Sequence, residues 1–214
     1  INDRIQLDKK ALPRFVERCI ALAFEGKTND DVPHPAMQAD ADNQQHLIHK
    51  FALNVARPVA LLPGAEYGPA KRWPIEYYAA LAQQLSAQGR AVWVLGSAKE
   101  TNLGEAITAQ APLAQNLIGK TSLTDALDLL ALTQHAVGND SGLMHLAAAA
   151  GTQVVALYGA TPPAYAPPLT HKKTVLYLGV PCSPCGQRVC PLQGEQHHQC
   201  LRGIGVEQVM RAVK

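Results

Sequence analysis

The pattern of hydrophobic and polar positions changes near residue 58. Before it, apolar residues at helical spacing predict one helix over residues 9–24, and the polar stretch that follows has no sustained period. After it, short apolar runs alternate with amphipathic stretches. The runs predict strands over residues 59–62, 91–95, 135–137, 153–158 and 174–178. The amphipathic stretches predict helices over residues 74–88, 99–110, 123–132 and 141–150.

This alternation of strands and helices predicts the α/β class, with a Rossmann-like parallel sheet and helices on both faces. The polar, proline-containing residues 26–57 are interpreted as a linker between a helical unit, 1–25, and the sheet domain, 58–214. Ligands of such sheets bind at the carboxyl ends of the strands. The loops that follow the strands are therefore the places to search for chemistry.

Composition narrows the class further. The chain has 214 residues, of which 47% are hydrophobic, enough for one ordinary domain or slightly more. A formal net charge of +2 and the lack of a Lys/Arg run argue against a nucleic-acid partner. No apolar stretch approaches the length of a membrane span. Because the first residue is Ile1 rather than Met, we expect the sequence to be a fragment whose upstream part is missing.

The first candidate loop, residues 63–74, joins the first strand of the sheet domain to its first helix. Gly64 lets the backbone approach a ligand closely, and Lys71 and Arg72 place two cations beside a helix N-terminus, which suits a diphosphate. The glycine spacing is not that of a Walker A loop, and no G-x-G-x-x-G follows a strand. Taken alone, a solvated Lys–Arg pair before an ordinary helix explains the loop equally well.

The second candidate loop begins the helix predicted over residues 141–150. It contains Asp140, Ser141, Gly142 and His145. The first N–H groups of a helix have no partner within it and favour anions. We expect either Asp140 or Ser141 to cap the helix, which leaves the other for a ligand.

Helix phase separates this histidine from the core. Leu143, Leu146, Ala147 and Ala150 form an apolar stripe that is expected to face the sheet. His145 lies about 200° from Leu143 around the helix and points away from that stripe.

Four strings in order, residues 63–74, 96–100, 139–145 and 156–161, resemble the ADP-heptose:lipopolysaccharide heptosyltransferases, glycosyltransferase family nine. The first and third strings are especially close to the heptosyltransferase II branch. The resemblance implies a GT-B fold, of which residues 58–214 are the carboxy-terminal, donor-binding domain. It also makes residues 1–25 the end of the amino-terminal acceptor domain.

The resemblance implies an activity as well. Such enzymes transfer L-glycero-D-manno-heptose from ADP-heptose to the heptose/Kdo inner core of lipopolysaccharide, with inversion and without a required metal cofactor. The implied setting is the cytoplasm of a Gram-negative cell, peripherally at the inner membrane. The general base of the family is an aspartate of the amino-terminal domain, outside this sequence. We therefore expect the chain to bind ADP-containing ligands weakly and not to turn over alone.

Several residues match the family pattern. Lys71 matches a lysine that contacts the donor phosphates and stabilises the leaving group. Glu100 matches a glutamate that bonds the ribose hydroxyls, although a first-turn acid favoured by the helix dipole is an equal explanation. Asp140 is expected to accept bonds from sugar hydroxyls or backbone N–H groups rather than face a diphosphate. The expected donor-binding set is Gly64, Lys71, Glu100, Asp140, Ser141, Gly142 and His145.

Donor binding leaves one segment unexplained, the cysteine-rich residues 181–203. It contains Cys182, Cys185, Cys190 and Cys200, with His197 and His198. One C-x2-C and two isolated cysteines fall short of the paired knuckles of a zinc ribbon. A structural zinc site and reduced structural thiols are the two main alternatives, with redox chemistry a third.

Two other functions compete with a heptosyltransferase II. One is another member of the family, such as heptosyltransferase I or a later core enzyme, because acceptor choice lies mostly in the missing domain. The other is a non-catalytic, metal-stabilised binding module centred on the cysteines. The module leaves the loops over 63–74 and 139–145 unexplained.

Overall fold

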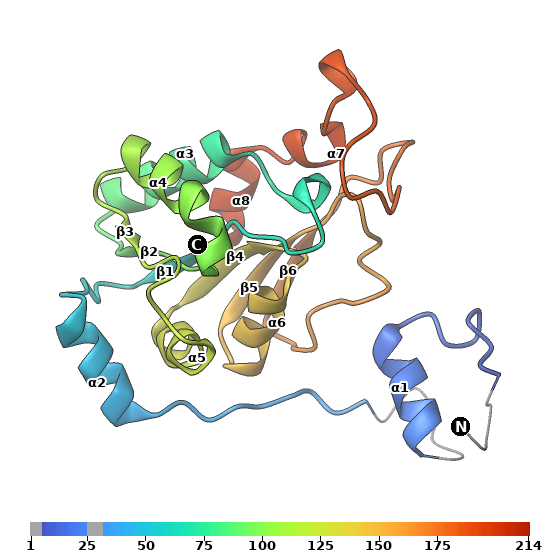
Figure 1. The fold of residues 1–214 in the computed structure, drawn as a ribbon, viewed down its shortest axis with the longest axis horizontal. Helices are drawn as coiled ribbons and strands as arrows, with labels where there is room; N and C mark the ends of the chain where they lie inside the picture. The colour runs from blue at the N-terminus through green and yellow to red at the C-terminus, as the bar shows by residue number, and fades with distance from the viewer. Residues whose placement is uncertain (1–5, 25–31) are drawn as a thin grey trace.

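The structure, a computed structural model, describes residues 6–24 and 32–214 (Figure 1). Its centre is one sheet of six strands in the order β3-β2-β1-β4-β5-β6, and every neighbouring pair is parallel. The strands are β1 (Val59–Leu62), β2 (Val92–Val94), β3 (Gln115–Asn116), β4 (His135–Asn139), β5 (Gln153–Leu157) and β6 (Lys173–Leu176). The predicted α/β class is confirmed. The two-residue β3 was not predicted.

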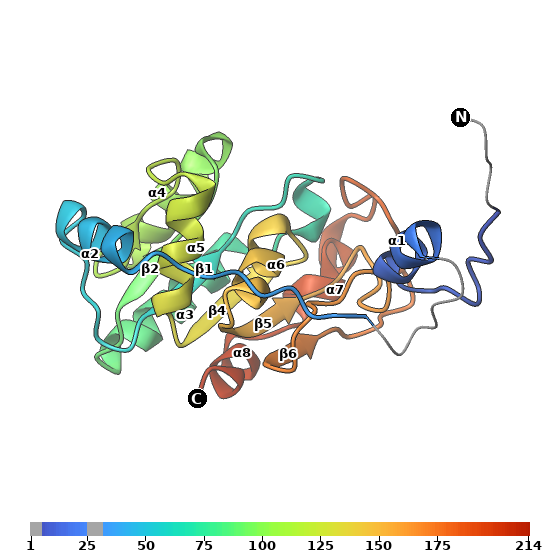
Figure 2. The ribbon, with the colours of Figure 1, turned by 90° about the horizontal axis from the view of Figure 1, so that it is seen from below.

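Helices cover both faces of the sheet (Figures 1 and 2). One face carries α3 (Ile75–Ala87), α4 (Thr101–Gln110) and α8 (Val206–Ala212). The other carries α2 (Ala41–Lys50), α5 (Leu123–Leu132) and α6 (Gly142–Ala149). The other helical elements among the described residues are α1 (Phe15–Ala23), α7 (Gln199–Arg202) and the short 3₁₀ turns η2 (Pro69–Lys71), η3 (Ala98–Glu100) and η4 (Gly194–Gln196).

The core follows from the alternation of side chains along each strand. In β1, Val59 and Leu61 pack with α3, α4 and α8, whereas Ala60 and Leu62 pack with α2, α5 and α6. All four are buried, because a parallel sheet is covered on both faces. Across the described residues, no helix is both long and apolar enough to cross a membrane.

The strand order places the ligand site. The chain runs outward from β1 to β2 and β3, then returns to add β4 on the other side of β1. The connections that leave β1 and β4 therefore diverge, and a crevice opens between them at the carboxyl ends of the strands. These are the two loops that the sequence singled out.

The segment predicted as a linker contains a helix, α2, although its sequence has no helical period. The Asp40 carboxylate caps it and accepts from the Asn43 backbone N–H at 3.2 Å. The Asn43 side-chain amide donates to Asp125 Oδ1 at 3.0 Å and to Asp128 Oδ2 at 2.7 Å, both on α5. Only Leu47 is buried in α2. The periodic signal is missing because a cap and polar tertiary contacts hold this helix. The domain boundaries themselves stay a prediction.

Two other helices differ from prediction. The first, α1, begins at Phe15 rather than residue 9, because Pro13 interrupts the helical stretch. In α6 the predicted core stripe is too narrow: Ala147 is buried and Leu143, Leu146 and Ala150 pack half-buried against the core, but Met144, Ala148 and Ala149, outside the stripe, are buried as well. Helix α6 packs against strands β4 and β5 and against α5, so its apolar residues extend beyond one stripe.

Candidate functional site

A cavity of about 350 Å³ opens at the carboxyl end of β1, between η3, α5 and the start of α6. This volume lies within the range of small-molecule sites. Four predicted donor-binding residues line it: Gly64, Glu100, Ser141 and Gly142. The apolar part of the wall is formed by Leu62, Ala65, Leu123, Ala126 and Leu143.

Glu100 contributes a nearly buried carboxylate to this cavity, with 8% of the residue exposed. Its Oε2 accepts from the backbone N–H and the hydroxyl of Ser97, both at 2.9 Å. A Cβ on Gly64 would lie 2.1 Å from Glu100 Oε1, so a side chain at this position would displace the carboxylate from its place beside the first loop. Glu100 thus stabilises its own helical turn and also lines the cavity.

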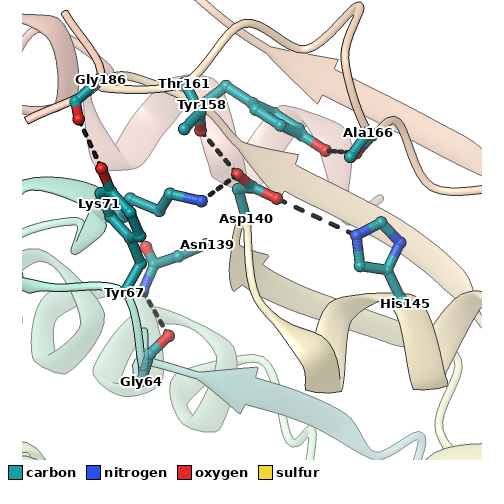
Figure 3. A network of polar contacts seen from close by, with 10 residues as sticks. All are labelled: Gly64, Tyr67, Lys71, Asn139, Asp140, His145, Tyr158, Thr161, Ala166 and Gly186. Carbon is teal, nitrogen blue, oxygen red and sulfur yellow. Dashed lines mark hydrogen bonds and ion pairs between the residues drawn. The ribbon is translucent and has the colours of Figure 1, made fainter. Parts of the chain in front are cut away.

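Beside the cavity, Asp140 is the centre of a polar network (Figure 3). Its Oδ2 accepts from Lys71 Nζ and from Thr161 Oγ1, each at 2.6 Å. The Lys71 and Asp140 side chains are only 13% and 11% exposed. His145 Nε2 lies 4.0 Å from Asp140 Oδ1. The positively charged end of Lys71 is therefore held in place by a carboxylate.

Ser141 occupies the N-cap position of α6, but its side chain makes no capping hydrogen bond. Nothing within 4 Å would meet a Cβ on Gly142, so the space beside the start of the helix is open. Asp140 is committed to Lys71 and Thr161 instead. The first turn of α6 therefore presents backbone N–H groups next to an open cavity.

The seven predicted residues form two adjacent groups. Gly64, Glu100, Ser141 and Gly142 line the cavity, and Lys71, Asp140 and His145 form the neighbouring network. The groups meet where Asp140 is followed by Ser141 at the start of α6. His145 also lines a second hollow of about 200 Å³, whose wall includes Phe15 of α1 and Tyr165.

The pKa of His145 is lowered from its usual value, mainly by burial and also by the nearby Lys71 charge, with Asp140 acting in the opposite direction. Burial is also the main cause that lowers the pKa of His135 and of His198. These imidazoles bind protons less readily in the folded chain than in the unfolded one.

We expect a pH dependence of stability from these three histidines. Their depressed pKa values mean that the unfolded chain takes up protons first, so stability is fully present above about pH 6.5 and decreases as the pH falls towards 5. Thermal unfolding across this window should show the decrease, and His135→Gln should make it shallower. An equal pH dependence in that variant would contradict the assignment.

Asn139 is a fully buried residue that the sequence reasoning did not select. Its side-chain amide donates to the carbonyl groups of Pro63 at 2.8 Å and Gly64 at 3.2 Å. Its carbonyl oxygen accepts from the Trp73 backbone N–H at 2.8 Å and the Tyr78 hydroxyl at 3.2 Å. It thus fastens both ends of the first loop to the end of β4. In the sequence, the signal that could have identified Asn139 is a polar residue at the end of an apolar strand.

Thr161 and Tyr67 were also not selected. Thr161 follows β5 and holds the Asp140 carboxylate. Tyr67 lies in the first loop, with its ring centre 5.0 Å from Lys71 Nζ. Neither has a local sequence signal beyond its place in a loop after a strand, because both act through partners far away in the chain.

The cysteine-rich segment lies near this site. Cys182, Cys185, Cys190 and Cys200 all line one hollow of about 70 Å³, together with Ala70, which precedes Lys71. Burial, followed by the charges of the other three cysteines, raises the pKa of the Cys200 thiol to about 11. Within residues 6–24 and 32–214, no three His, Cys, Asp or Glu side chains are arranged to hold a metal ion. The zinc and reduced-thiol alternatives stay predictions, and a metal assay on reduced, purified protein separates them.

The fold and the site define an α/β protein of the doubly wound class, with its ligand crevice at the point where the strand order reverses. Comparison with known proteins identifies the family within this class. The chain belongs to glycosyltransferase family 9 (heptosyltransferase), whose family model matches residues 1–195.

The relatives include heptosyltransferases of type 2 and one of type 1. Lipooligosaccharide heptosyltransferase 2 of Haemophilus influenzae is 44% identical over 193 residues, which cover 83% of this chain and 56% of that protein. Lipopolysaccharide heptosyltransferase 2 of Escherichia coli is 43% identical over 191 residues, covering 83% and 55%. Lipopolysaccharide heptosyltransferase 1 of Pseudomonas aeruginosa is 30% identical over 141 residues, covering 64% and 39%. The chain is a heptosyltransferase II homologue and spans just over half the length of the curated type 2 relatives named here.

Solved structures agree with the fold. The structure of E. coli ADP-heptose lipopolysaccharide heptosyltransferase II matches with a TM-score of 0.83 at 39% identity, over 100% of this chain and 64% of that one. The predicted Rossmann-like α/β sheet is thereby confirmed, and it matches a GT-B heptosyltransferase over part of that enzyme's chain. The lysine, the carboxylates and the helix start that we singled out lie within the region matched by the family.

Proposed function

We propose that this chain is the donor-binding half of an enzyme that transfers L-glycero-D-manno-heptose from ADP-heptose to the inner core of lipopolysaccharide. The observation that carries the proposal is the Lys71–Asp140 pair beside a cavity of about 350 Å³ at the start of α6. An ammonium group and unpaired helical N–H groups at one place suit a diphosphate. The type 2 relatives point to the second heptosyltransferase of the pathway rather than the first.

The donor is proposed to lie across the two groups of residues. The adenosine occupies the cavity, with the ribose hydroxyls towards Glu100 Oε1, which makes no hydrogen bond to Ser97. The diphosphate lies at the start of α6, beside Ser141 and Gly142, where Lys71 reaches it. The heptose then extends towards Asp140 and His145.

The reaction needs charge stabilisation more than covalent chemistry from this chain. The acceptor hydroxyl oxygen forms a bond to the anomeric carbon from the face opposite the diphosphate, and its proton passes to a general base. The bond to the ADP oxygen breaks with its electron pair, so negative charge grows on the diphosphate. Lys71 and the first turn of α6 stabilise this charge, and we propose that no metal is required for it.

The acceptor determines where the enzyme works. Lipopolysaccharide core is built on a membrane-anchored lipid, so we propose that the protein acts peripherally at the cytoplasmic face of the inner membrane. ADP-heptose and the core acceptor are its partners under this proposal.

Ligand-induced thermal shift tests the proposal. ADP and ADP-heptose are expected to raise the unfolding temperature of the chain, and more so the tighter they bind, whereas UDP, which has the diphosphate but not the adenine, should raise it less. The unfolding temperature of a metal-stabilised module would instead be unchanged by all three nucleotides and would fall when a chelator removes the metal. No shift with either adenine nucleotide, from a cooperatively folded chain, would contradict the proposal.

Replacing Glu100 tests the ribose contact. Glu100→Gln is expected to weaken ADP binding about fivefold because a charge-assisted hydrogen bond becomes a neutral one. Titration calorimetry measures this change. Glu76→Gln is the matched control, since Glu76 is also a first-turn acid, of α3, but pairs with Arg202 away from the cavity. Equal effects of the two variants would leave Glu100 with only a helix-dipole role.

A further inference from the structure

The loop that carries Lys71 is held from outside by the cysteine-rich segment. The Tyr67 hydroxyl donates to the Gly186 carbonyl at 2.5 Å (Figure 3). Arg188 Nε donates to the Tyr67 carbonyl at 2.8 Å, and the Ala70 N–H donates to the Arg188 carbonyl at 3.0 Å. The two side-chain contacts join residues 119 and 121 positions apart in the chain. The proposed contacts with the donor do not involve these bonds.

The two backbones approach so closely that a side chain is excluded between them. A Cβ on Gly68 would lie 2.4 Å from the Arg188 carbonyl oxygen. Gly68 also precedes the three-residue turn η2 at its N-cap position, and the turn, which ends at Lys71, has no side-chain cap. A single 3₁₀ turn has little stability of its own. The position of Lys71 therefore depends on what the turn packs against.

The Lys71 side chain is aligned by an aromatic ring. Its Nζ lies 5.0 Å from the centre of the Tyr67 ring, and the guanidinium carbon of Arg188 lies 5.6 Å from the same centre. Figure 3 shows the Lys71 chain running beside this ring towards Asp140. Both distances are in the range of cation–π contacts. Arg188 thus contacts Tyr67 through its ring and its carbonyl, and Tyr67 contacts Lys71.

We propose that Tyr67 and Arg188 are positioning residues that hold Lys71 towards the donor diphosphate. The inference rests on the proposed function, since it assigns these residues to the same reaction. Arg188 acts through Tyr67 and does not itself touch the donor. The segment with the four cysteines then has a role in the donor site, through Gly186 and Arg188.

A comparison of ADP with adenosine tests the positioning role, because adenosine lacks the phosphates. In Arg188→Ala, ADP is expected to bind about fivefold more weakly, as one charge-assisted hydrogen bond and one cation–π contact are lost. Adenosine affinity should stay unchanged. Tyr67→Leu should behave likewise, and Tyr67→Phe, which keeps the ring, should recover most of the ADP affinity. Ligand-observed NMR of the whole chain gives both affinities, and thermal unfolding confirms that each variant is folded.

The same substitution in a Lys71→Ala background shows how Arg188 acts. If Arg188 works through Lys71, Arg188→Ala has no further effect on ADP there. A fivefold loss that persists without Lys71 would mean direct contact with the phosphates and would overturn the inference. An equal loss of adenosine binding would also overturn it, in favour of a structural role. Failure of the unmodified chain to bind ADP at all is a separate result, against the proposed function.

Discussion

Lys71→Ala is expected to weaken ADP binding about thirtyfold, because a charge-assisted contact in a largely buried site is lost. It also leaves Asp140, 11% exposed, without its cation. Titration calorimetry with ADP measures the affinity, and thermal unfolding of the free chain measures the effect on the fold. Lys71→Arg, which keeps a positive charge, should bind ADP with an intermediate affinity.

The variant Asp140→Asn tests the other member of the Lys71–Asp140 ion pair. Asp140 competes with a diphosphate for Lys71, to which it is bonded at 2.6 Å in the free protein. Removing its charge is therefore expected to leave ADP affinity equal or higher, while ADP-heptose, whose sugar hydroxyls keep only a neutral acceptor, binds more weakly. Should Asp140→Asn weaken ADP binding as strongly as Lys71→Ala does, Asp140 would help to form the phosphate site and its assignment to the sugar would be wrong.

Asn139→Ala is expected to lower the free energy of unfolding by about 3 kcal/mol, since several buried hydrogen-bonding groups lose their partner at once. These include the Trp73 backbone N–H and the Pro63 carbonyl. In a chain of this size the unfolding temperature should fall by about 10 °C. Calorimetry or circular dichroism measures both quantities.

A matched control separates this site from any other buried hydrogen bond. Thr152 is 4% exposed, and its hydroxyl donates one bond to the Leu130 carbonyl at 2.6 Å, away from the donor loops. Thr152→Val should cost about 1 kcal/mol and leave ADP affinity unchanged. If Asn139→Ala is no more costly than Thr152→Val, Asn139 does not fasten the first loop.

The sequence predicted most of the sheet because its strands are short apolar runs separated by clear helices. The helix α5 was predicted at its observed bounds, and Lys71 and Asp140, chosen as parts of two separate loops, lie in contact. Periodicity failed where tertiary contacts decide the structure. In α2, Asn43 and the Asp40 cap hold a polar helix, and in β3 pairing with β2 defines a strand of two residues.

The residues around the site were hard to predict for a related reason. Arg188 is an exposed side chain in a segment chosen for its cysteines, and only the folded chain brings it to Tyr67. Asn139 resembles any polar residue at a strand end until its four partners are known. A pattern read along the chain finds residues whose role depends on their neighbours in sequence. Such a pattern does not find residues whose role depends on contacts with residues far away in the chain.

The central position of β1 has a consequence for synthesis of the protein. When only β1, β2 and β3 have emerged, the side of β1 that later pairs with β4 is an open, apolar edge, and such edges promote aggregation. Pairing of β4 closes this edge, and the same event brings Asp140 to Lys71. Protection of the nascent chain and assembly of the donor site therefore both depend on β4. A delay in translation before residue 135 would put both at risk together.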